Sequence, residues 1–360
     1  NGGPLVRRVR HGRASFHVLP PPVVGTTLPS LNGNRILLPL FTLTRPPSGM
    51  KCMAGYDVVG FGIATIDHFG VVDRYPDEDS KQPLVGYTQQ GGGTVATPLV
   101  ACARLGLSAA YLGRLGDNDT SAAVELGLQR EGVATGMCLR ESAFEPPVAL
   151  ILVNPATHSR PITWLRRQAA DIHPEQPHRG RLQPSLALYI DAHEGAASLA
   201  GACWARDAGR LVVVDADNLT DGIRPVLPLA HVIIGSERFA ELYTGDPDAE
   251  RGAHRLHEDF GGICGITAGA QGSHIVTDSR AFHQPAFPVD VVDTTGAGDV
   301  YHGAFVYGLL AAWPPEDCAR FAAAVAAMKC RSLGGRAGIP SYADAVAFLG
   351  DRRETGAWSA

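Results

Sequence analysis

Short apolar segments of strand length alternate with helical segments along most of this chain, and that alternation restricts the fold more than any other feature. Six segments are short and apolar, as buried strands are: 56–60, 109–112, 187–190, 211–214, 232–234 and 263–267. Helical patterns lie between them, at 94–105, 119–131, 196–208, 236–243 and 249–260. Repeated strand–helix units predict an α/β fold, with a mainly parallel central sheet and helices on both of its faces.

Two segments interrupt this alternation. Residues 70–90 and 148–166 contain extended or alternating apolar runs without an intervening helix. The sequences VALILVN and RPITWL in the second segment predict a hairpin with its turn near 155–159. We expect both segments to form a small antiparallel sheet apart from the main one, and such a sheet could close over a site as a lid.

The N-terminal residues differ in charge from the rest of the chain. Residues 1–56 hold seven basic and no acidic side chains, which leaves 24 basic against 36 acidic residues, a net charge of −12, in the remainder. An Arg-rich, acid-poor segment is typical of a transit peptide, but the prolines of this one break any long helix. The alternative is that the segment is upstream sequence and that the natural protein starts at Met50 or Met53, just before the first predicted strand. We therefore expect a basic Pro-rich extension (1–52), one domain (53–350) and a tail (351–360). The expected location is cytoplasmic, or an organelle if the extension is a transit peptide.

Charge and apolar pattern also exclude several classes of protein. The whole chain has a net charge of −5, so nothing in its charge suggests nucleic-acid binding. No apolar run reaches the ~18 residues that span a membrane. Seven cysteines without a CxxC pair predict reduced thiols rather than a disulfide framework or zinc site. A P-loop is excluded because no Gly-Lys pair occurs.

The strongest functional signal is the sequence VDVVDTTGAGDVYHG at 289–303, in which a β-branched run ends in DTTGAGD and a helix follows. Gly296, Ala297 and Gly298 can turn tightly and leave backbone N–H groups free at the helix N-terminus, which makes an anion site. Asp299 follows in the first helical turn. A carboxylate beside an anion site is suited to take a proton from a hydroxyl that attacks a phosphate.

DTTGAGD followed by a helix resembles the second signature of the ribokinase/PfkB family of carbohydrate kinases. The sequence GGGTVATPLVACARLG at 91–106 is similar to the family's first signature, and GRLGDNDT and ITAGAQG match further family segments in type and order. The resemblance runs from about 57 to 349. It implies a ribokinase-like fold with a small β-sheet lid, and ATP-dependent phosphorylation of a sugar hydroxyl with Mg²⁺ as cofactor.

The resemblance also implies roles for individual residues. Asp299 resembles the catalytic base, and the Gly296–Gly298 amides resemble the anion hole for the transferred phosphoryl group. Positions that resemble sugar ligands are Asp67, Gly91, Gly92, Gly93 and Thr97. Positions that resemble nucleotide-site residues are Ser236, Thr267, Gly269, Gly272 and Gly335. Asp293 and Thr295 lie where many members bind a monovalent cation such as K⁺.

The chain departs from the family pattern at two places. Thr97 stands where the family usually has Asn, so one sugar contact differs. The family's N-x-x-E motif is here SERF, beginning at Ser236, and its last residue, Phe239, cannot organise Mg²⁺ as the family's Glu does. Glu237 or Asp215 could substitute for that Glu, or Mg²⁺ could be held mainly by ATP.

Within the family, the segments HQPAFPVDVVDTTGAGDVYHGA, MKC and GGRAGIP most resemble the sulfofructose kinase branch. Lys81 lies where that branch has a sulfonate-contacting lysine, although an ordinary solvated lid residue fits the sequence equally. The other sulfonate contacts are not found around 163–164 and 191–193, so the substrate stays open. Two alternatives are a kinase of the same fold acting on a nucleoside or other small alcohol, and a non-catalytic sugar or nucleotide sensor. Lid-to-lid dimers occur among relatives, so a homodimer through the lid is a further expectation.

Overall fold

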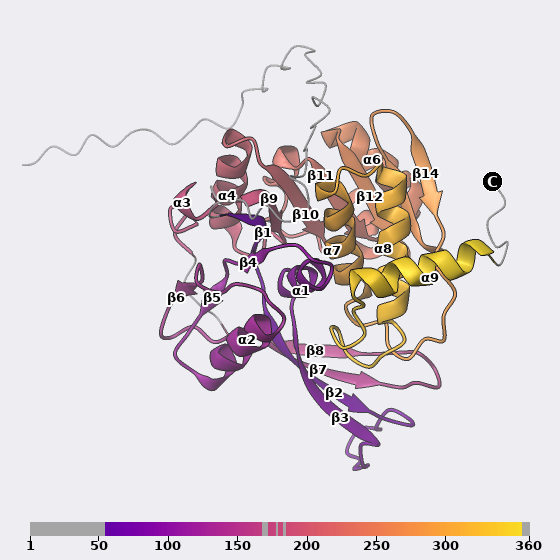
Figure 1. The fold of residues 1–360 in the computed structure, drawn as a ribbon. Coiled ribbons are helices and arrows are strands. Elements are labelled where there is room, and N and C mark those ends of the chain that lie inside the picture. The colour runs from indigo at the N-terminus through magenta and orange to yellow at the C-terminus, as the bar shows by residue number, and fades with distance from the viewer. Residues whose placement is uncertain (1–54, 168–171, 178, 183–184, 355–360) are drawn as a thin grey trace, which may run out of the picture. The chain divides into compact units, whose positions relative to one another are not determined.

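The computed structural model describes residues 55–354, apart from 168–171, 178 and 183–184 (Figure 1). The chain divides into two units, Asn1–Phe41 and Thr42–Ala360. The first unit, and with it the predicted extension 1–52, lies outside the described residues. The predicted tail begins within a helix, which continues as far as Glu354.

An eight-stranded sheet forms the centre of the domain, in the spatial order β14-β13-β12-β11-β10-β9-β1-β4 (Figure 1). Pairing is parallel from β12 to β4, and β13 and β14 extend the sheet antiparallel. The strands are β1 (Tyr56–Phe61), β4 (Ala109–Tyr111), β9 (Ser185–Ile190), β10 (Leu211–Ala216), β11 (Val232–Ser236), β12 (Ile263–Thr267), β13 (Ser273–Val276) and β14 (Ala281–Gln284). All six predicted strands and the mainly parallel sheet are confirmed.

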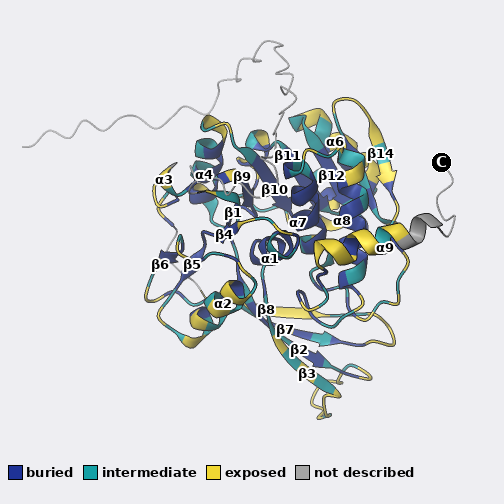
Figure 2. Cartoon of the chain, viewed as in Figure 1, coloured by how far each residue is buried: buried dark blue, intermediate teal, exposed yellow. Residues whose placement is uncertain are grey.

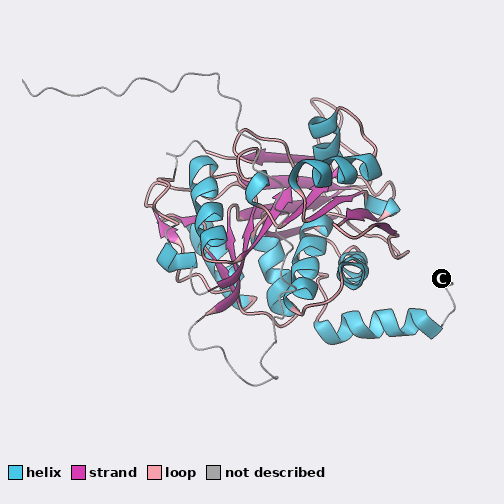
Figure 3. Cartoon of the chain, turned by 90° about the horizontal axis from the view of Figure 1, so that it is seen from above, coloured by secondary structure: helices cyan, strands magenta, loops and turns pink. Residues whose placement is uncertain are grey.

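Helices cover both faces of this sheet (Figure 3). One apolar core includes side chains of α1 (Ala96–Arg104), α2 (Asp119–Arg130), α7 (Ala297–Leu310), α8 (Pro315–Lys329) and α9 (Tyr342–Glu354). The other includes side chains of α3 (Arg179–Leu182), α4 (Gly195–Asp207), α5 (Glu237–Thr244), α6 (Ala249–Phe260) and the short η1 (Leu227–Leu229). Adjacent residues of a strand point to opposite faces, so Val58 enters the first core and Val59 the second. The predicted layers are therefore confirmed.

A second, four-stranded sheet forms the lid, in the order β3-β2-β7-β8. Its strands are β2 (Thr65–Val71), β3 (Gly86–Gly92), β7 (Val148–Val153) and β8 (Ile162–Leu165), and a separate pair joins β5 (Arg114–Leu115) to β6 (Leu139–Arg140). The predicted hairpin is present, with Asn154 bridged to Ser159 at its turn. The lid sheet is antiparallel except where β2 and β7 pair in parallel, because these strands enter the lid in the same direction from different parts of the domain.

The lid buries only part of its surface, whereas the central sheet is buried on both faces (Figure 2). Phe69, Ala149, Ile151 and Val153 form a small core that also contacts Leu333. Large apolar side chains stay exposed on and beside the lid strands, namely Leu84, Val85, Tyr87, Leu150, Ile162, Trp164 and Leu165.

The described residues contain neither a membrane-spanning helix nor a disulfide. Within the described residues, no helix is long and apolar enough to cross a membrane. Six of the seven cysteines fall in that part of the chain, and all six are free thiols, as predicted: Cys102, Cys138, Cys203, Cys264, Cys318 and Cys330.

Candidate active site

The predicted glycine turn lies at the N-terminus of α7. Gly296 caps the helix with φ of 72°, in the left-handed region that glycine adopts without strain. The helix begins at Ala297, so Gly298 and Asp299 lie in its first turn. The Ala297 N–H donates to Thr294 O at 3.1 Å, whereas the N–H groups of Gly298 and Asp299 have no acceptor among the described residues. Of the three amides predicted to form the anion site, those of Gly296 and Gly298 thus have no acceptor among the described residues, whereas that of Ala297 does.

Asp299 lies in a strongly acidic environment. Burial, together with the nearby carboxylates of Asp215, Asp217 and Asp67, raises the pKa of Asp299 to about 8, and His302 opposes the shift. Asp67 comes from the lid strand β2, so a carboxylate of the lid contributes to the electrostatic environment of the predicted base. A carboxyl group with a pKa near physiological pH is suited to accept a proton and release it again.

A buried polar network lies beside Asp299. The Tyr189 hydroxyl donates to Asp215 Oδ2 at 2.7 Å and lies 2.9 Å from His302 Nδ1, and that nitrogen lies 3.2 Å from the same carboxylate oxygen. Burial opposes the charged form of His302, but the carboxylates of Asp215, Asp299 and Asp217 together outweigh it and raise the pKa of His302. Tyr189 and this connection were not predicted, although His302 at three residues after Asp299 was a sequence signal for it.

The predicted sugar-side residues surround Asp67. Asp67 is buried and accepts a hydrogen bond from Thr65 Oγ1 at 2.6 Å; burial raises the pKa of Asp67, while Thr65 and Arg336 lower it. A Cβ on Gly92 would lie 1.9 Å from Asp67 Oδ2, and one on Gly91 would lie 2.2 Å from the Arg336 guanidinium. These glycines therefore make room for a carboxylate and a guanidinium. Gly93 instead serves a turn, at φ of 104°.

Arg336 completes this side of the site, and the sequence analysis assigned it no role. Its guanidinium is buried, donating from Nη2 to Gly92 O at 2.6 Å and from Nε to Thr97 Oγ1 at 3.3 Å. Burial lowers the pKa of Arg336 to about 10, and Asp67 opposes that shift. Thr97, the departure from the family's Asn, thus contacts this arginine. In the sequence, Arg336 lies in the segment GGRAGIP, which contributed to the prediction only through the resemblance to the family.

Besides the bond from Arg336 to Gly92 on β3, further hydrogen bonds connect the lid to the rest of the site. Gln90 Nε2 on β3 donates to Leu333 O at 2.9 Å, and Arg160 Nε, from the β7–β8 connection, donates to Thr294 Oγ1 at 2.7 Å. Trp164 is 69% exposed, and its pairing with Ala149 places it on the core-facing side of the lid sheet. Lys81 is exposed between β2 and β3 and hydrogen-bonds to none of the described residues.

The predicted nucleotide-side residues meet at the carboxyl ends of β11 and β12. Ser236 and Thr267 are paired in register, and Ser236 also caps α5 by accepting from the Phe239 N–H at 3.1 Å. Gly269 (φ 53°) and Gly272 (φ 98°) bound the single turn η2 (Gly269–Gln271). This edge of a parallel sheet is where α/β proteins bind ligands.

The remaining predicted residues lie around the start of the turn. Gly335 packs on Gly296, whose Cβ, if present, would lie 3.1 Å from Gly335 Cα. Asp293 and Thr295 are both buried and hydrogen-bonded to each other at 2.7 Å. The structure therefore places Gly335 against Gly296, and Thr97 and Gly92 at Arg336, whereas no contact ties Lys81 to any of them.

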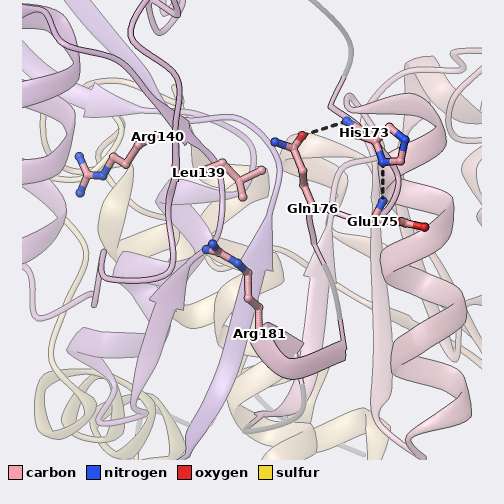
Figure 4. A pocket seen from close by; sticks show the side chains of 6 residues that line it. All are labelled: Leu139, Arg140, His173, Glu175, Gln176 and Arg181. Carbon is pink, nitrogen blue, oxygen red and sulfur yellow. Dashed lines mark hydrogen bonds between the residues drawn. The ribbon is translucent and has the colours of Figure 1, made fainter.

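A surface depression lies elsewhere and contains none of the predicted residues. Its volume is about 470 Å³, and it is lined by Leu139, Arg140, His173, Glu175, Gln176 and Arg181 (Figure 4). There, His173 Nδ1 accepts the Glu175 N–H at 3.3 Å, and the His173 N–H donates to Gln176 Oε1 at 2.9 Å. These polar groups bind each other, so the depression is not assigned to the chemistry of the turn.

Comparison with known proteins gives the same assignment as the geometry. The model of the pfkB family carbohydrate kinases matches residues 56–341. This chain belongs to that family. As a pfkB family carbohydrate kinase, it is a phosphotransferase with an alcohol group as acceptor and it binds ATP.

Individual relatives are distant but cover most of the domain. The 5-dehydro-2-deoxygluconokinase of Shouchella clausii is 25% identical over 317 residues, covering 82% of this chain and 95% of that protein. Haemophilus influenzae ribokinase is 25% identical, covering 72% and 87%. The structure of Arabidopsis thaliana ribokinase with ribose and ATP superposes with a TM-score of 0.72 at 20% identity, covering 82% and 99%. This last similarity supports the ribokinase-like fold.

Proposed function

We propose that this pfkB family kinase transfers the γ-phosphoryl group of ATP to a sugar hydroxyl, with Asp299 as general base. The observation that supports this is the position of Asp299: it shares the first turn of α7 with the N–H of Gly298, which has no acceptor among the described residues. The hydroxyl proton passes to the Asp299 carboxylate, the oxygen forms the new bond to the γ-phosphorus, and the bond to ADP breaks.

In this mechanism the turn stabilises the charge on the transferred group. The free N–H groups of Gly298 and Asp299, at the positive end of α7, would donate to the phosphoryl oxygens. The acceptor would bind at Asp67 and at Gly92, the end of β3 that Arg336 holds by a hydrogen bond. These contacts would orient its hydroxyl toward Asp299. The lid contacts made by Gln90 and Arg160 would exclude water, which limits hydrolysis of ATP.

Mg²⁺ fits the acidic edge beside this turn. Asp217 directly follows β10 and is exposed, so its carboxylate can be reached by a cation that arrives with a ligand. Among the described residues no cluster of three metal-binding side chains exists, and Mg²⁺ is commonly held by one or two carboxylates together with phosphates. Asp217, with Glu237 on α5, would hold Mg²⁺ that arrives with ATP and offsets phosphate charge. Phe239 is fully buried and has no ligand atom, and Asp215 already accepts a hydrogen bond from Tyr189, so neither residue is assigned to Mg²⁺.

A sugar is the acceptor that we favour. Curated relatives include a fructokinase of Klebsiella pneumoniae, 28% identical, and the ribokinase and 5-dehydro-2-deoxygluconokinase named above. The C-terminal resemblance to the sulfofructose kinase branch makes sulfosugars one class to include, with Lys81 as the candidate sulfonate contact. A nucleoside is the second candidate, because a nucleoside kinase of Methanothermobacter thermautotrophicus is 20% identical over 84% of this chain. The exposed apolar side chains of the lid sheet support the expected homodimer.

An ADP-release assay over ketoses, pentoses, sulfosugars and nucleosides tests this function. We expect sugar-dependent ADP release from the wild type and almost none from Asp299→Asn. Phosphorylation of nucleosides alone would favour the second candidate. Binding of nucleotide and sugar without turnover across the whole panel would indicate a sensor and contradict the proposal.

A further inference from the structure

Lys329 is a fully buried lysine beside the catalytic turn. It is the last residue of α8, its exposed fraction is 0%, and it is one of three lysines in the chain. Lysine is almost never fully buried unless its charge is paired. The group that Lys329 binds is therefore the key to why a charged side chain is buried here.

The Lys329 ammonium binds the segment that leads into the turn. Nζ donates to the main-chain carbonyl oxygen of Asp293 at 2.8 Å. Next to Lys329, the carbonyl of Cys330 accepts the N–H groups of Val292 and Asp293, at 2.8 and 3.2 Å. The end of α8 is thus fixed to the backbone six residues before Asp299.

The Asp293 carboxylate, which is only 3% exposed, is fully engaged as well. Oδ1 accepts the Thr295 N–H at 2.9 Å and the Thr295 hydroxyl at 2.7 Å, and Oδ2 accepts the Gly334 N–H at 2.8 Å. A buried carboxylate needs a nearby positive charge, and Lys329 on the same residue's carbonyl supplies one.

These contacts do not fit the monovalent cation that the sequence analysis expected at Asp293 and Thr295. Such an ion would need several oxygen ligands, but both Asp293 carboxylate oxygens already accept hydrogen bonds and the Asp293 carbonyl accepts one from Lys329. A cation at Asp293 would also lie next to the Lys329 ammonium, and like charges repel strongly where water is excluded.

We propose that the Lys329 ammonium takes the place of a bound monovalent cation, so that catalysis by this kinase needs no added K⁺. Lys329 acts as a positioning residue: it holds the Asp293–Thr295 segment, which in turn orients Gly296 and Asp299. The effect on turnover depends on the proposed kinase function, whereas the effects on stability and nucleotide binding do not.

The test measures kcat, melting temperature and ATP affinity with K⁺, NH₄⁺ or tetramethylammonium chloride at constant ionic strength. For the wild type we expect all three quantities to be the same in each salt. Lys329→Ala leaves a space that a small cation can enter. This variant should lose kcat by roughly tenfold to a hundredfold, as for loss of a charged hydrogen bond, and K⁺ or NH₄⁺ should partly restore kcat and the melting temperature.

Lys329→Met and Arg331→Ala are the matched variants. Met fills the space without charge, so we expect its loss of kcat to persist in every salt. Arg331 is exposed two residues further on, and its replacement should not create any response to K⁺. A purely structural lysine would give Lys329→Ala and Lys329→Met the same salt-independent loss.

Three results would overturn the proposal: K⁺-dependent activity or melting temperature in the wild type, full activity of Lys329→Ala without small cations, or a folded Lys329→Ala that K⁺ does not affect. Should Lys329→Ala fail to fold, the salt dependence of the wild type still decides. A wild type that turns over no acceptor would contradict the kinase function, but its melting temperature and ATP affinity in the three salts would still test Lys329.

Discussion

The two halves of the candidate site are built differently. The phosphoryl half, Asp293–Asp299, is one continuous segment whose backbone amides and carboxylate follow from a tight turn into α7. The acceptor half is assembled from β2, β3, α1 and the loop after α8, through Asp67, Gly92, Thr97 and Arg336. The first half is local and recognisable as a motif, whereas the second exists only after distant segments have packed together.

Substitutions in the two halves should therefore change different kinetic quantities. A change in the phosphoryl half should reduce the rate of the chemical step, because the charged transition state is stabilised there. A change in the acceptor half should mainly weaken binding of the alcohol, because in the proposed mechanism its groups would hold the substrate rather than the transferred phosphate.

The largest effect is expected for Asp299→Asn, which removes the base and keeps the shape of the side chain. Its kcat should fall by roughly 10²–10⁴, the usual contribution of a general base, and its ATP affinity should change little. ADP release with the best acceptor measures the rate, and thermal unfolding checks the fold. Turnover close to wild type in a folded variant would show that the phosphoryl half lacks the assigned base.

Arg336→Met sharpens the other side of the comparison. It removes the hydrogen bonds to Gly92 and Thr97, so the KM for the acceptor should rise by about tenfold to a hundredfold, with the KM for ATP near that of the wild type. Thr97→Val removes only the weaker bond and should cause a smaller rise. Equal losses for both substrates would mean that Arg336 supports the whole site rather than its acceptor half.

The pH profile tests whether the acidic groups around Asp299 act as a unit. Because a base must be deprotonated and the pKa of Asp299 is about 8, kcat/KM should rise by roughly tenfold per pH unit below that value and level off above it. Asp215 raises this pKa, so Asp215→Asn should move the rise to lower pH. An unmoved profile would assign the titration to another group, such as ATP itself.

The smallest effect concerns backbone conformation within the phosphoryl half. Gly296→Ala introduces a Cβ at φ of 72°, close to Gly335, and should destabilise the fold by about 1–2 kcal/mol. Gly298→Ala meets no atom within 4 Å in an ordinary helical conformation and should be neutral or stabilise by about 0.4–1 kcal/mol. Urea unfolding compares the two, and shifts of the same sign would argue against a left-handed requirement at Gly296.

Much of the fold was predictable from the sequence, and the reason lies in its strands. Segments such as 211–214 and 232–234 are apolar throughout because the central sheet is buried on both faces, so composition alone identifies them. The lid strands were placed less accurately. β2 starts at Thr65, before the predicted boundary of 70, because the polar residues Thr65, Asp67 and His68 interrupt its apolar run.

The site residues were predicted in two ways: the turn Gly296–Asp299 from its local backbone pattern, and others such as Asp67 and Thr267 from the resemblance to the family. Tyr189, Arg336 and Lys329 were missed because each is a single polar residue inside an ordinary strand, loop or helix pattern. Their partners are Asp215, Gly92 and Asp293, which lie from 26 to 244 positions away along the chain. No periodicity encodes such pairs.

By itself, the sequence determined the α/β layers and the turn that joins free amides to Asp299, because both depend on apolar pattern and on local backbone conformation. Only the tertiary structure decided which groups a charged side chain meets inside the domain. Arg336 binds the carbonyl of Gly92, Lys329 binds the carbonyl of Asp293, and Asp215 acts on the pKa of Asp299. The physical reason is that burial makes a charge costly unless a partner is present, and folding alone brings those partners together.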